Sequence, residues 1–135
     1  MSDQQIEQEI QAKGKTAPRI TPTDIEACIA NVHYFTAADG VAGAIGAELY
    51  PVAESDIGSS KTVEVISVNP TLGLLTFCVL ILRNGFTVTG ESACASPENF
   101  DPEIGRKIAR QNAIQKIWPL EGYLLKEKLS HDRHL

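Results

Sequence analysis

Cysteine and histidine are scarce in this sequence, and the few that occur are not spaced for a metal site or a disulfide framework. The 135 residues include three cysteines, Cys28, Cys78 and Cys94, and three histidines, of which only His33 lies outside the C-terminal tail. An odd number of cysteines without metal-type spacing favours a reducing compartment, so we expect a cytoplasmic protein. There is no Walker-type glycine loop and no dinucleotide-binding fingerprint, so we expect neither a metal nor a cofactor.

The sequence also lacks an excess of positive charge and a long apolar run. Its net charge is -5 and its pI is about 5.1, whereas proteins that bind duplex nucleic acid normally carry a basic face for the phosphate backbone. The longest apolar run, 74–82, is much shorter than the roughly 20 residues needed to span a bilayer. No signal-peptide core follows the N-terminus. We therefore expect no duplex nucleic acid and no membrane among its partners.

The residues that are present predict one α+β domain over residues 1–135. A chain of this length with 43% hydrophobic residues is expected to form a single core. Residues 3–12 predict a short helix, the segment 21–24 (TPTD) is a strong helix start, and residues 33–36 and 61–68 predict strands. We expect a mainly antiparallel sheet with short N-terminal helices and two C-terminal helices packed on it.

The stretch from 74 to 129 is the most informative part of the chain. Residues 74–82 are typical of a strand covered on both faces, or of an interior strand in an oligomer. Asn84-Gly85 is a strong hairpin signal, because both residues tolerate positive φ, and residues 86–90 then alternate between apolar and polar. We therefore predict a β-hairpin that leads into the C-terminal helices.

The first C-terminal helix is predicted to begin at Asp101-Pro102-Glu103, which supply a cap, a proline at the first position and an acid. Pro119 is expected to break or restart the helix, and residues 120–129 form the second helix. The face expected to meet the sheet comprises Ile104, Ile108, Ile114 and Trp118. The contact face of the second helix comprises Leu124, Leu125 and Leu129.

Residues 37–60 form a long segment that carries four of the ten glycines and shows no sustained period. We predict a loop here. Long loops in small domains are usually functional or disordered, so two interpretations stay open. The loop closes over a ligand or reaches a partner subunit, or it is an inert surface excursion.

The basic residues near the start of the C-terminal helix need a reason, because cations there oppose the helix dipole by roughly 0.3–1 kcal/mol each. Arg106, Lys107 and Arg110 lie within its first three turns. One explanation is local pairing with Glu103, which lies three and four residues earlier. The other is an anion site in which Arg106, Arg110 and free helix N–H groups hold phosphate.

The segment 91–100, between the second hairpin strand and that helix, is suited to specificity groups. Asn99 is a candidate for reading a base edge. Phe100 is a candidate for stacking on a base or, alternatively, for a hydrophobic staple. The remaining candidates in the hairpin are Phe77 and Phe86 for stacking on a base, and Thr87 and Thr89 for binding hydroxyls.

A nucleophile hypothesis for Cys94 lacks partners, because His33 is the only histidine outside the tail and catalysis needs a base and an orienting group. We therefore expect a protein that is not an enzyme.

Five segments of the sequence resemble a family of small phage proteins that includes the first type of Thoeris anti-defence protein. These segments are 33–40 (HYFTAADG), 83–94 (RNGFTVTGESAC), 99–101 (NFD), 105–110 (GRKIAR) and 117–123 (IWPLEGY). The resemblance implies a homo-oligomeric sponge in the cytoplasm of the bacterial host. Such a sponge sequesters cyclic ADP-ribose isomers made by TIR-domain enzymes without cleaving them, and it also holds cyclic di- or trinucleotides at a separate site.

The same resemblance implies a pocket shared by two protomers. In the family it is lined by two arginines four residues apart on the C-terminal helix, a strand phenylalanine and an asparagine. Arg106 and Arg110 match the arginine pair. The other positions stay open among Phe77, Phe86, Asn84 and Asn99, and Arg19 is a candidate for the second nucleotide site.

Two other functions remain in competition with the sponge. One is a protein-interaction module that inhibits a host protein. The other is a small hydrolase of the same nucleotides that uses Glu91 or Cys94.

Overall fold

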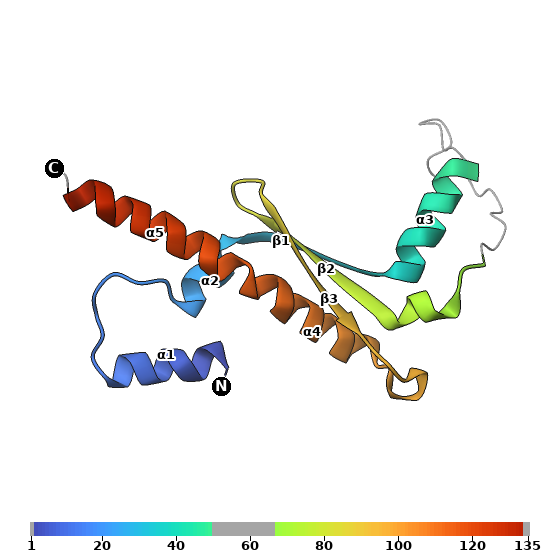
Figure 1. Ribbon diagram of the computed structural model, residues 1–135, viewed down its shortest axis with the longest axis horizontal. Coiled ribbons are helices and arrows are strands. Elements are labelled where there is room, and N and C mark those ends of the chain that lie inside the picture. The colour runs from blue at the N-terminus through green and yellow to red at the C-terminus, as the bar shows by residue number, and fades with distance from the viewer. Residues whose placement is uncertain (1, 50–66, 134–135) are drawn as a thin grey trace.

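A three-stranded antiparallel sheet lies at the centre of the computed structural model, which describes residues 2–49 and 67–133. The strands are β1 (Ile29–Thr36), β2 (Leu75–Leu82) and β3 (Thr87–Ala93), with β2 in the middle. Helix α4 (Pro102–Gln115) crosses one face of this sheet (Figure 1). The α+β fold with a mainly antiparallel sheet is therefore confirmed.

The N-terminal helices form where the sequence predicts them. Helix α1 (Asp3–Ala12) and helix α2 (Pro22–Cys28) each begin with a capping box, formed by Ser2 with Gln5 and by Thr21 with Asp24. Strand β1 begins at Ile29, directly after α2, and is therefore longer than the strand predicted over 33–36. The strand predicted over 61–68 lies mostly outside the described residues, and Ser67 and Val68 have no regular structure.

Residues 37–49 form helix α3 (Ala37–Leu49), so the prediction of a loop over this part of 37–60 was wrong. The physical reason is a third capping box. The Asp39 backbone N–H donates to the Thr36 hydroxyl at 3.1 Å, and the Thr36 backbone N–H donates to the Asp39 carboxylate at 3.0 Å. Five alanines then favour the helix and outweigh its glycines. Residues 50–60 of the predicted loop lie outside the described residues.

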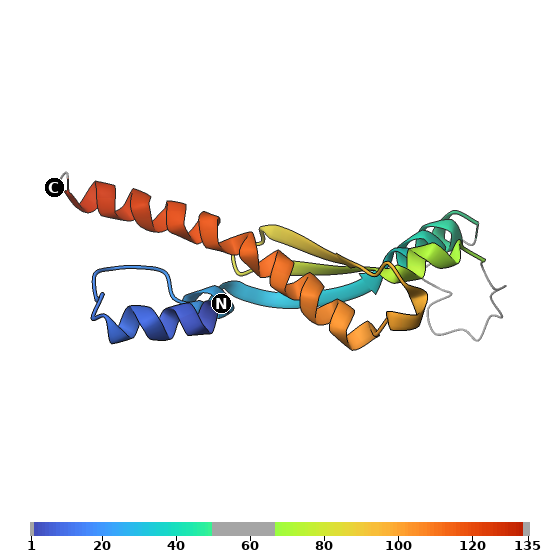
Figure 2. The same ribbon diagram turned by 60° about the horizontal axis from the view of Figure 1, so that its bottom comes forward.

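Short 3₁₀ helices flank the sheet. Helix η2 (Pro70–Leu74) leads into β2 and packs on α3, and helix η3 (Pro97–Asn99) connects β3 to α4. Figures 1 and 2 show α3 at one end of the molecule and the end of α5 (Ile117–Arg133) at the other. Helix α5 continues the direction of α4 and extends beyond the sheet.

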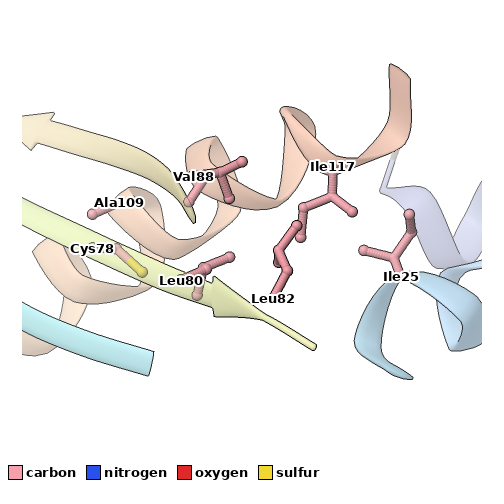
Figure 3. Close-up of a cluster of buried hydrophobic side chains, with 8 residues drawn as sticks. Ile25, Cys78, Leu80, Leu82, Val88, Ala109 and Ile117 are labelled. Atoms are coloured by element: carbon pink, nitrogen blue, oxygen red, sulfur yellow. The ribbon is translucent and has the colours of Figure 1, made fainter. Parts of the chain in front are cut away.

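The core lies between the sheet, α4 and α2 (Figure 3). The side chains of Leu80, Leu82 and Ile117 lie close together there, and Ile25 closes the end of the cluster. The buried hydrophobic residues are Ile25, Cys78, Leu80, Leu82, Val88, Ala109, Ala113 and Ile117.

The face of α4 that meets the sheet is only partly the predicted one, because Ile114 and Trp118 pack against the core and the other two predicted residues do not. Ile104 and Ile108 are 54% and 44% exposed, whereas Gly105, Ala109 and Ala113 are buried. Large side chains do not fit between α4 and the sheet, because the helix backbone passes directly over Gly90 of β3. A Cβ at Gly90 would lie 2.2 Å from the Ala109 carbonyl oxygen and 2.3 Å from the Ala113 nitrogen. Small residues therefore set this contact.

The second C-terminal helix starts earlier than predicted. Helix α5 begins at Ile117 and includes Pro119 in its first turn. The backbone N–H groups of the first turn have no partner within the helix, so a proline there costs no helical hydrogen bond. Of its predicted contact residues, Leu124 is 56% exposed, and Leu125 and Leu129 are partly buried. None of the helices in the described ranges has the length and apolar character needed to cross a membrane.

The two faces of β2 differ in how deeply their side chains are buried. Thr76, Cys78, Leu80 and Leu82 face α4 and are buried, and the alternating residues Leu75, Phe77, Val79 and Ile81 on the other face are partly exposed. Strand β2 is thus an interior strand of the sheet, and among the described residues α4 covers only one of its faces.

Candidate functional site

The N-terminus of α4 is already capped, which removes one part of the predicted phosphate site. The Asp101 side chain accepts hydrogen bonds from the backbone N–H groups of Glu103 at 2.9 Å and Ile104 at 3.3 Å. Pro102 has no N–H to offer. The helix start therefore does not present the free N–H groups that were expected, and any anion site here rests on side chains.

The three cations of α4 have different surroundings. Lys107 lies 3.4 Å from Glu103, and both side chains are more than 70% exposed, as local pairing predicts. Arg110 donates to both carboxylate oxygens of Glu26 in α2, at 3.2 and 2.8 Å. Arg106 makes no hydrogen bond or ion pair with any residue in 2–49 or 67–133. Local pairing thus accounts for Lys107 and leaves Arg106 without an explanation.

Tyr34 of β1 lies beside both arginines and was not among the predicted residues. Its partner across the sheet is Cys78, so its side chain is on the face that α4 covers. Partial burial raises the pKa of the Tyr34 hydroxyl, and the positive charges of Arg110 and Arg106 act against this rise. The two cations therefore reach the same phenol. The sequence contains no signal for Tyr34, because only the register of β1 against β2 places it on the face that α4 covers.

A small cavity of about 90 Å³ opens beside Arg106, between the ends of β1 and β2 and the first turn of α4. It brings together an arginine, a carboxylate, hydroxyl groups and aromatic rings. The lining residues are Tyr34, Phe35, Thr36, Asp39, Thr76, Phe100, Pro102 and Arg106. Phe100 lies next to Gly105 as well as in this wall, so it is placed both as a helix-start contact and as a wall residue.

The wall of this cavity includes Thr76, whose hydroxyl group is buried and unpaired in the described part of the chain. The residue is 2% exposed, and its hydroxyl oxygen is buried without a hydrogen-bond partner among the described residues. Gly105 keeps α4 close to it, since a Cβ there would lie 3.0 Å from the Thr76 Oγ1. Neither Thr76 nor Gly105 was identified from the sequence, because Thr76 reads as one more residue of an apolar strand.

A larger groove of about 510 Å³ lies on the other side of Arg110, between α1, α2 and α4. Its main polar groups are already engaged. Arg110 binds Glu26, Lys107 binds Glu103, and the Trp118 indole N–H donates to Asp3 at 3.1 Å. The cavity beside Arg106 is therefore the stronger candidate, although the groove is larger.

Three of the other predicted ligand residues lie away from the arginines within one chain. Phe77 is on the opposite face of the sheet and stacks on Phe35, with ring centroids 5.4 Å apart. Asn84 lies in the hairpin turn, where its side-chain oxygen accepts from the Phe86 N–H at 2.9 Å, and Phe86 is 55% exposed. Asn99 is exposed in η3. The structure thus does not bring Phe77, Asn84 or Phe86 beside Arg106 and Arg110, whereas Asn99 directly precedes Phe100 of the cavity wall.

Arg19 is engaged in a different contact. Its guanidinium donates to both carboxylate oxygens of Glu7 in α1, to Oε2 at 2.7 Å, and to the Lys15 carbonyl oxygen at 3.3 Å. Glu7 is 6% exposed, and this bond lowers the pKa of its carboxyl. In this arrangement Arg19 fixes α1 to the segment before α2.

The residues of the hydrolase hypothesis are dispersed. The Cys94 thiol donates to the Ser96 carbonyl oxygen at 3.1 Å. Burial raises the pKa of Cys28 to about 11, and burial also raises that of Cys78. His33 and Glu91 project from the sheet face opposite α4. In the described ranges, no group of three or more His, Cys, Asp or Glu side chains could hold a metal ion.

Comparison with known proteins gives a family for this fold. The model of the phage protein (N4 Gp49/phage Sf6 gene 66) family matches residues 20–129. The chain belongs to this family. The match of this phage protein family includes the sheet, α4 and most of α5, and it leaves α1 and Arg19 outside. No curated protein and no solved structure matches the chain.

Proposed function

We propose that this phage protein is a non-catalytic anti-defence sponge that binds and sequesters cyclic nucleotide immune signals. Its preferred ligands are cyclic ADP-ribose isomers, and cyclic di- and trinucleotides are further candidates. The observation that carries the proposal is Arg106. It is an exposed cation without a partner in the described structure, one helical turn from Arg110 and beside Tyr34.

Phosphate chemistry accounts for this arrangement. Two guanidinium groups one turn apart bind a pyrophosphate through charge-assisted, bidentate hydrogen bonds, which are about twice as strong as neutral ones. Arg110 already binds a carboxylate in this way, because Glu26 occupies its two donors. In the proposed complex a phosphate oxygen replaces one of the Glu26 oxygens.

The pocket is proposed to be completed by a second copy of the chain in a homo-oligomer. A cavity of about 90 Å³ is too small to enclose a nucleotide, since ligand pockets generally measure 300–1,000 Å³. Phe77, Phe86 and Asn84 project from other surfaces of the same chain. A partner chain supplies an aromatic or amide group that the single chain does not bring to the arginines.

Calorimetric titration tests the proposal. Purified protein is titrated with a cyclic ADP-ribose isomer, and the ligand is recovered after heating and identified by its mass. We expect saturable heat and recovery of intact ligand. A hydrolysed product would favour the hydrolase, and no heat with any cyclic nucleotide would contradict the sponge.

Two arginine variants give the matched comparison. We expect Arg106→Ala and Arg110→Ala each to abolish measurable binding, with melting temperatures within a few degrees of the parent because exposed ion pairs contribute about 0–1 kcal/mol. Lys107→Ala is the control, because it removes a neighbouring cation already paired with Glu103. An equal loss of binding in Lys107→Ala would mean that binding depends on the total positive charge of α4 and not on the two arginines.

A protein-interaction module is the second candidate, and α5 favours it. Tyr123 and Leu124 are 71% and 56% exposed on a helix that extends beyond the sheet. Contiguous exposed apolar patches are typical of interaction sites, and these two neighbouring side chains are the candidate for such a patch. In pull-down from host lysate, the interaction module requires that Tyr123→Ser with Leu124→Ser loses a host protein while Arg106→Ala retains it.

A further inference from the structure

The unpartnered hydroxyl of Thr76 needs an explanation that packing does not give. Burying a hydroxyl without a hydrogen bond destabilises the native state, whereas a valine of the same shape would avoid that cost. Its neighbours on β2 that face α4, Cys78, Leu80 and Leu82, are apolar. A polar group at this one position is therefore unfavourable for folding. This cost suggests that the hydroxyl binds a group that is not part of the chain.

The position of Thr76 on the sheet shows what it adjoins. It pairs with Thr36 on β1 and with Ser92 on β3, so three hydroxyl groups form a row across the sheet beneath the first turn of α4. Thr36 is committed to the Asp39 backbone N–H as a helix cap. Thr76 is the buried, uncommitted member of this row, and it lines the cavity beside Arg106.

The lining of the cavity identifies the kind of group that fits. The Asp39 carboxylate faces the same space and accepts a hydrogen bond from the Thr36 N–H at 3.0 Å. A phosphate placed there would meet this negative charge at close range, whereas a sugar hydroxyl donates to a carboxylate and exchanges a hydrogen bond with a threonine hydroxyl. The rings of Tyr34 and Phe100 add apolar walls for the carbon face of a sugar.

We propose that this cavity is a ribose subsite in which Thr76 and Asp39 bind sugar hydroxyl groups, while the phosphates lie outside it on Arg106 and Arg110. The volume of about 90 Å³ leaves room for at most one small ring, and the carboxylate and hydroxyl lining favours a sugar ring there. The inference rests on the proposed nucleotide-binding function and assigns the two ends of the ligand to different residues.

The test separates sugar binding from phosphate binding. ADP-ribose and inorganic pyrophosphate are titrated into the parent protein and into Thr76→Val. We expect Thr76→Val to lower the affinity for ADP-ribose about tenfold, the loss of one to two buried hydrogen bonds, and to leave the affinity for pyrophosphate unchanged. Its melting temperature should equal or exceed that of the parent, because the unpaired hydroxyl is gone.

Two further variants make the result specific. Thr76→Ser keeps the hydroxyl and should retain the affinity for ADP-ribose, and Thr89→Val changes a threonine on the opposite face of the sheet and should change nothing. Unchanged ADP-ribose affinity in Thr76→Val, or an equal loss for pyrophosphate, would overturn the ribose subsite.

The sponge and the subsite fail in different ways. If the parent binds ADP-ribose with the expected dependence on Thr76 but gives no heat with cyclic ADP-ribose isomers, the subsite stands and the sponge is wrong. If the parent binds cyclic ADP-ribose isomers but Thr76→Val behaves as the parent with both probes, the sponge stands and the subsite is wrong. If ADP-ribose does not bind to the parent at all, the subsite is overturned directly.

Discussion

The two ends of helix α4 contact the same sheet in opposite ways. At its C-terminal end Ala109, Ala113 and the following Ile117 are fully buried over Gly90 and Leu80. At its N-terminal end the helix stands beside a cavity, and two polar groups, Arg106 and the Thr76 hydroxyl, have no partner in the described structure. The C-terminal half of the helix is thus close-packed on the sheet, whereas the N-terminal end retains polar groups without a partner in the described structure.

We interpret the difference as a change from residues that serve folding to residues that we propose bind a ligand. Unsatisfied buried groups and unpaired cations reduce stability, so they persist where another function depends on them. Arg110 lies at the boundary, because it faces Tyr34 on one side and binds Glu26 on the other. We interpret α4 as a helix whose close-packed half holds its binding half in place.

The largest predicted effect comes from the close-packed end. Gly90→Ala should lower the free energy of unfolding by about 3 kcal/mol or more, because the new methyl group meets backbone atoms of Ala109 and Ala113 that cannot move without shifting the helix. Thermal denaturation followed by circular dichroism measures it. A melting temperature within about 3 °C of the parent would show that α4 does not hold this position.

Gly122→Ala is the matched control for that substitution. Gly122 lies in α5 with nothing within 4 Å of an added Cβ. The same chemical change should there stabilise the protein by roughly 0.5–1 kcal/mol, because alanine is a better helix former than glycine.

An intermediate effect is expected at the boundary between the two ends. Glu26→Gln weakens the ion pair with Arg110 and should change the stability by less than about 1 kcal/mol, since Glu26 is 56% exposed. The affinity for pyrophosphate should rise by roughly threefold, because a competing carboxylate has lost its charge. Calorimetry of Glu26→Gln against Glu103→Gln measures this, and equal affinities would mean that Arg110 is not part of the phosphate site.

The smallest effect concerns a contact outside α4 and depends on pH. The hydrogen bond from Arg19 lowers the pKa of Glu7 below its unfolded value of about 4.3, so its contribution to stability is present above that pH and is lost as the pH falls through the folded value. The melting temperatures of the parent and Glu7→Gln should therefore converge below about pH 4. Glu9→Gln, at an exposed pair with Lys13, should match the parent throughout; a constant difference for Glu7→Gln would contradict the linkage.

Local signals predicted the elements well and their packing poorly. Caps at Thr21 and Asp101 and the Asn84-Gly85 turn act within a few residues, so they are visible in the sequence, and each forms where it was predicted. The turn type differs from the prediction, because Gly85 has a positive φ of 88° and Asn84 does not have a positive φ.

The predicted contact face of the first C-terminal helix was correct at Ile114 and Trp118 and wrong in the first two turns of α4. The contact there depends on Gly90, which is distant in sequence and sets how closely the helix approaches. Hydrophobic periodicity alone selected Ile104 and Ile108, which are exposed.

The candidate site followed the same division. The arginine pair could be predicted, because charges that oppose the helix dipole are recognisable from sequence. Tyr34, Asp39 and Thr76 were missed, because only the register of β1 against β2 and the position of α3 bring them beside Arg106. The assignments of Phe77, Phe86, Asn84 and Asn99 to a shared pocket stay predictions.

The central claim is tested most directly by identifying what the protein carries from a cell that makes the signal. The parent protein and Arg106→Ala are each purified from bacteria expressing an active TIR-domain enzyme, heated to release bound small molecules, and examined by mass spectrometry. We predict that the parent releases an intact cyclic ADP-ribose isomer and that Arg106→Ala releases none. No nucleotide from the parent, or the same amount from both proteins, would contradict the account.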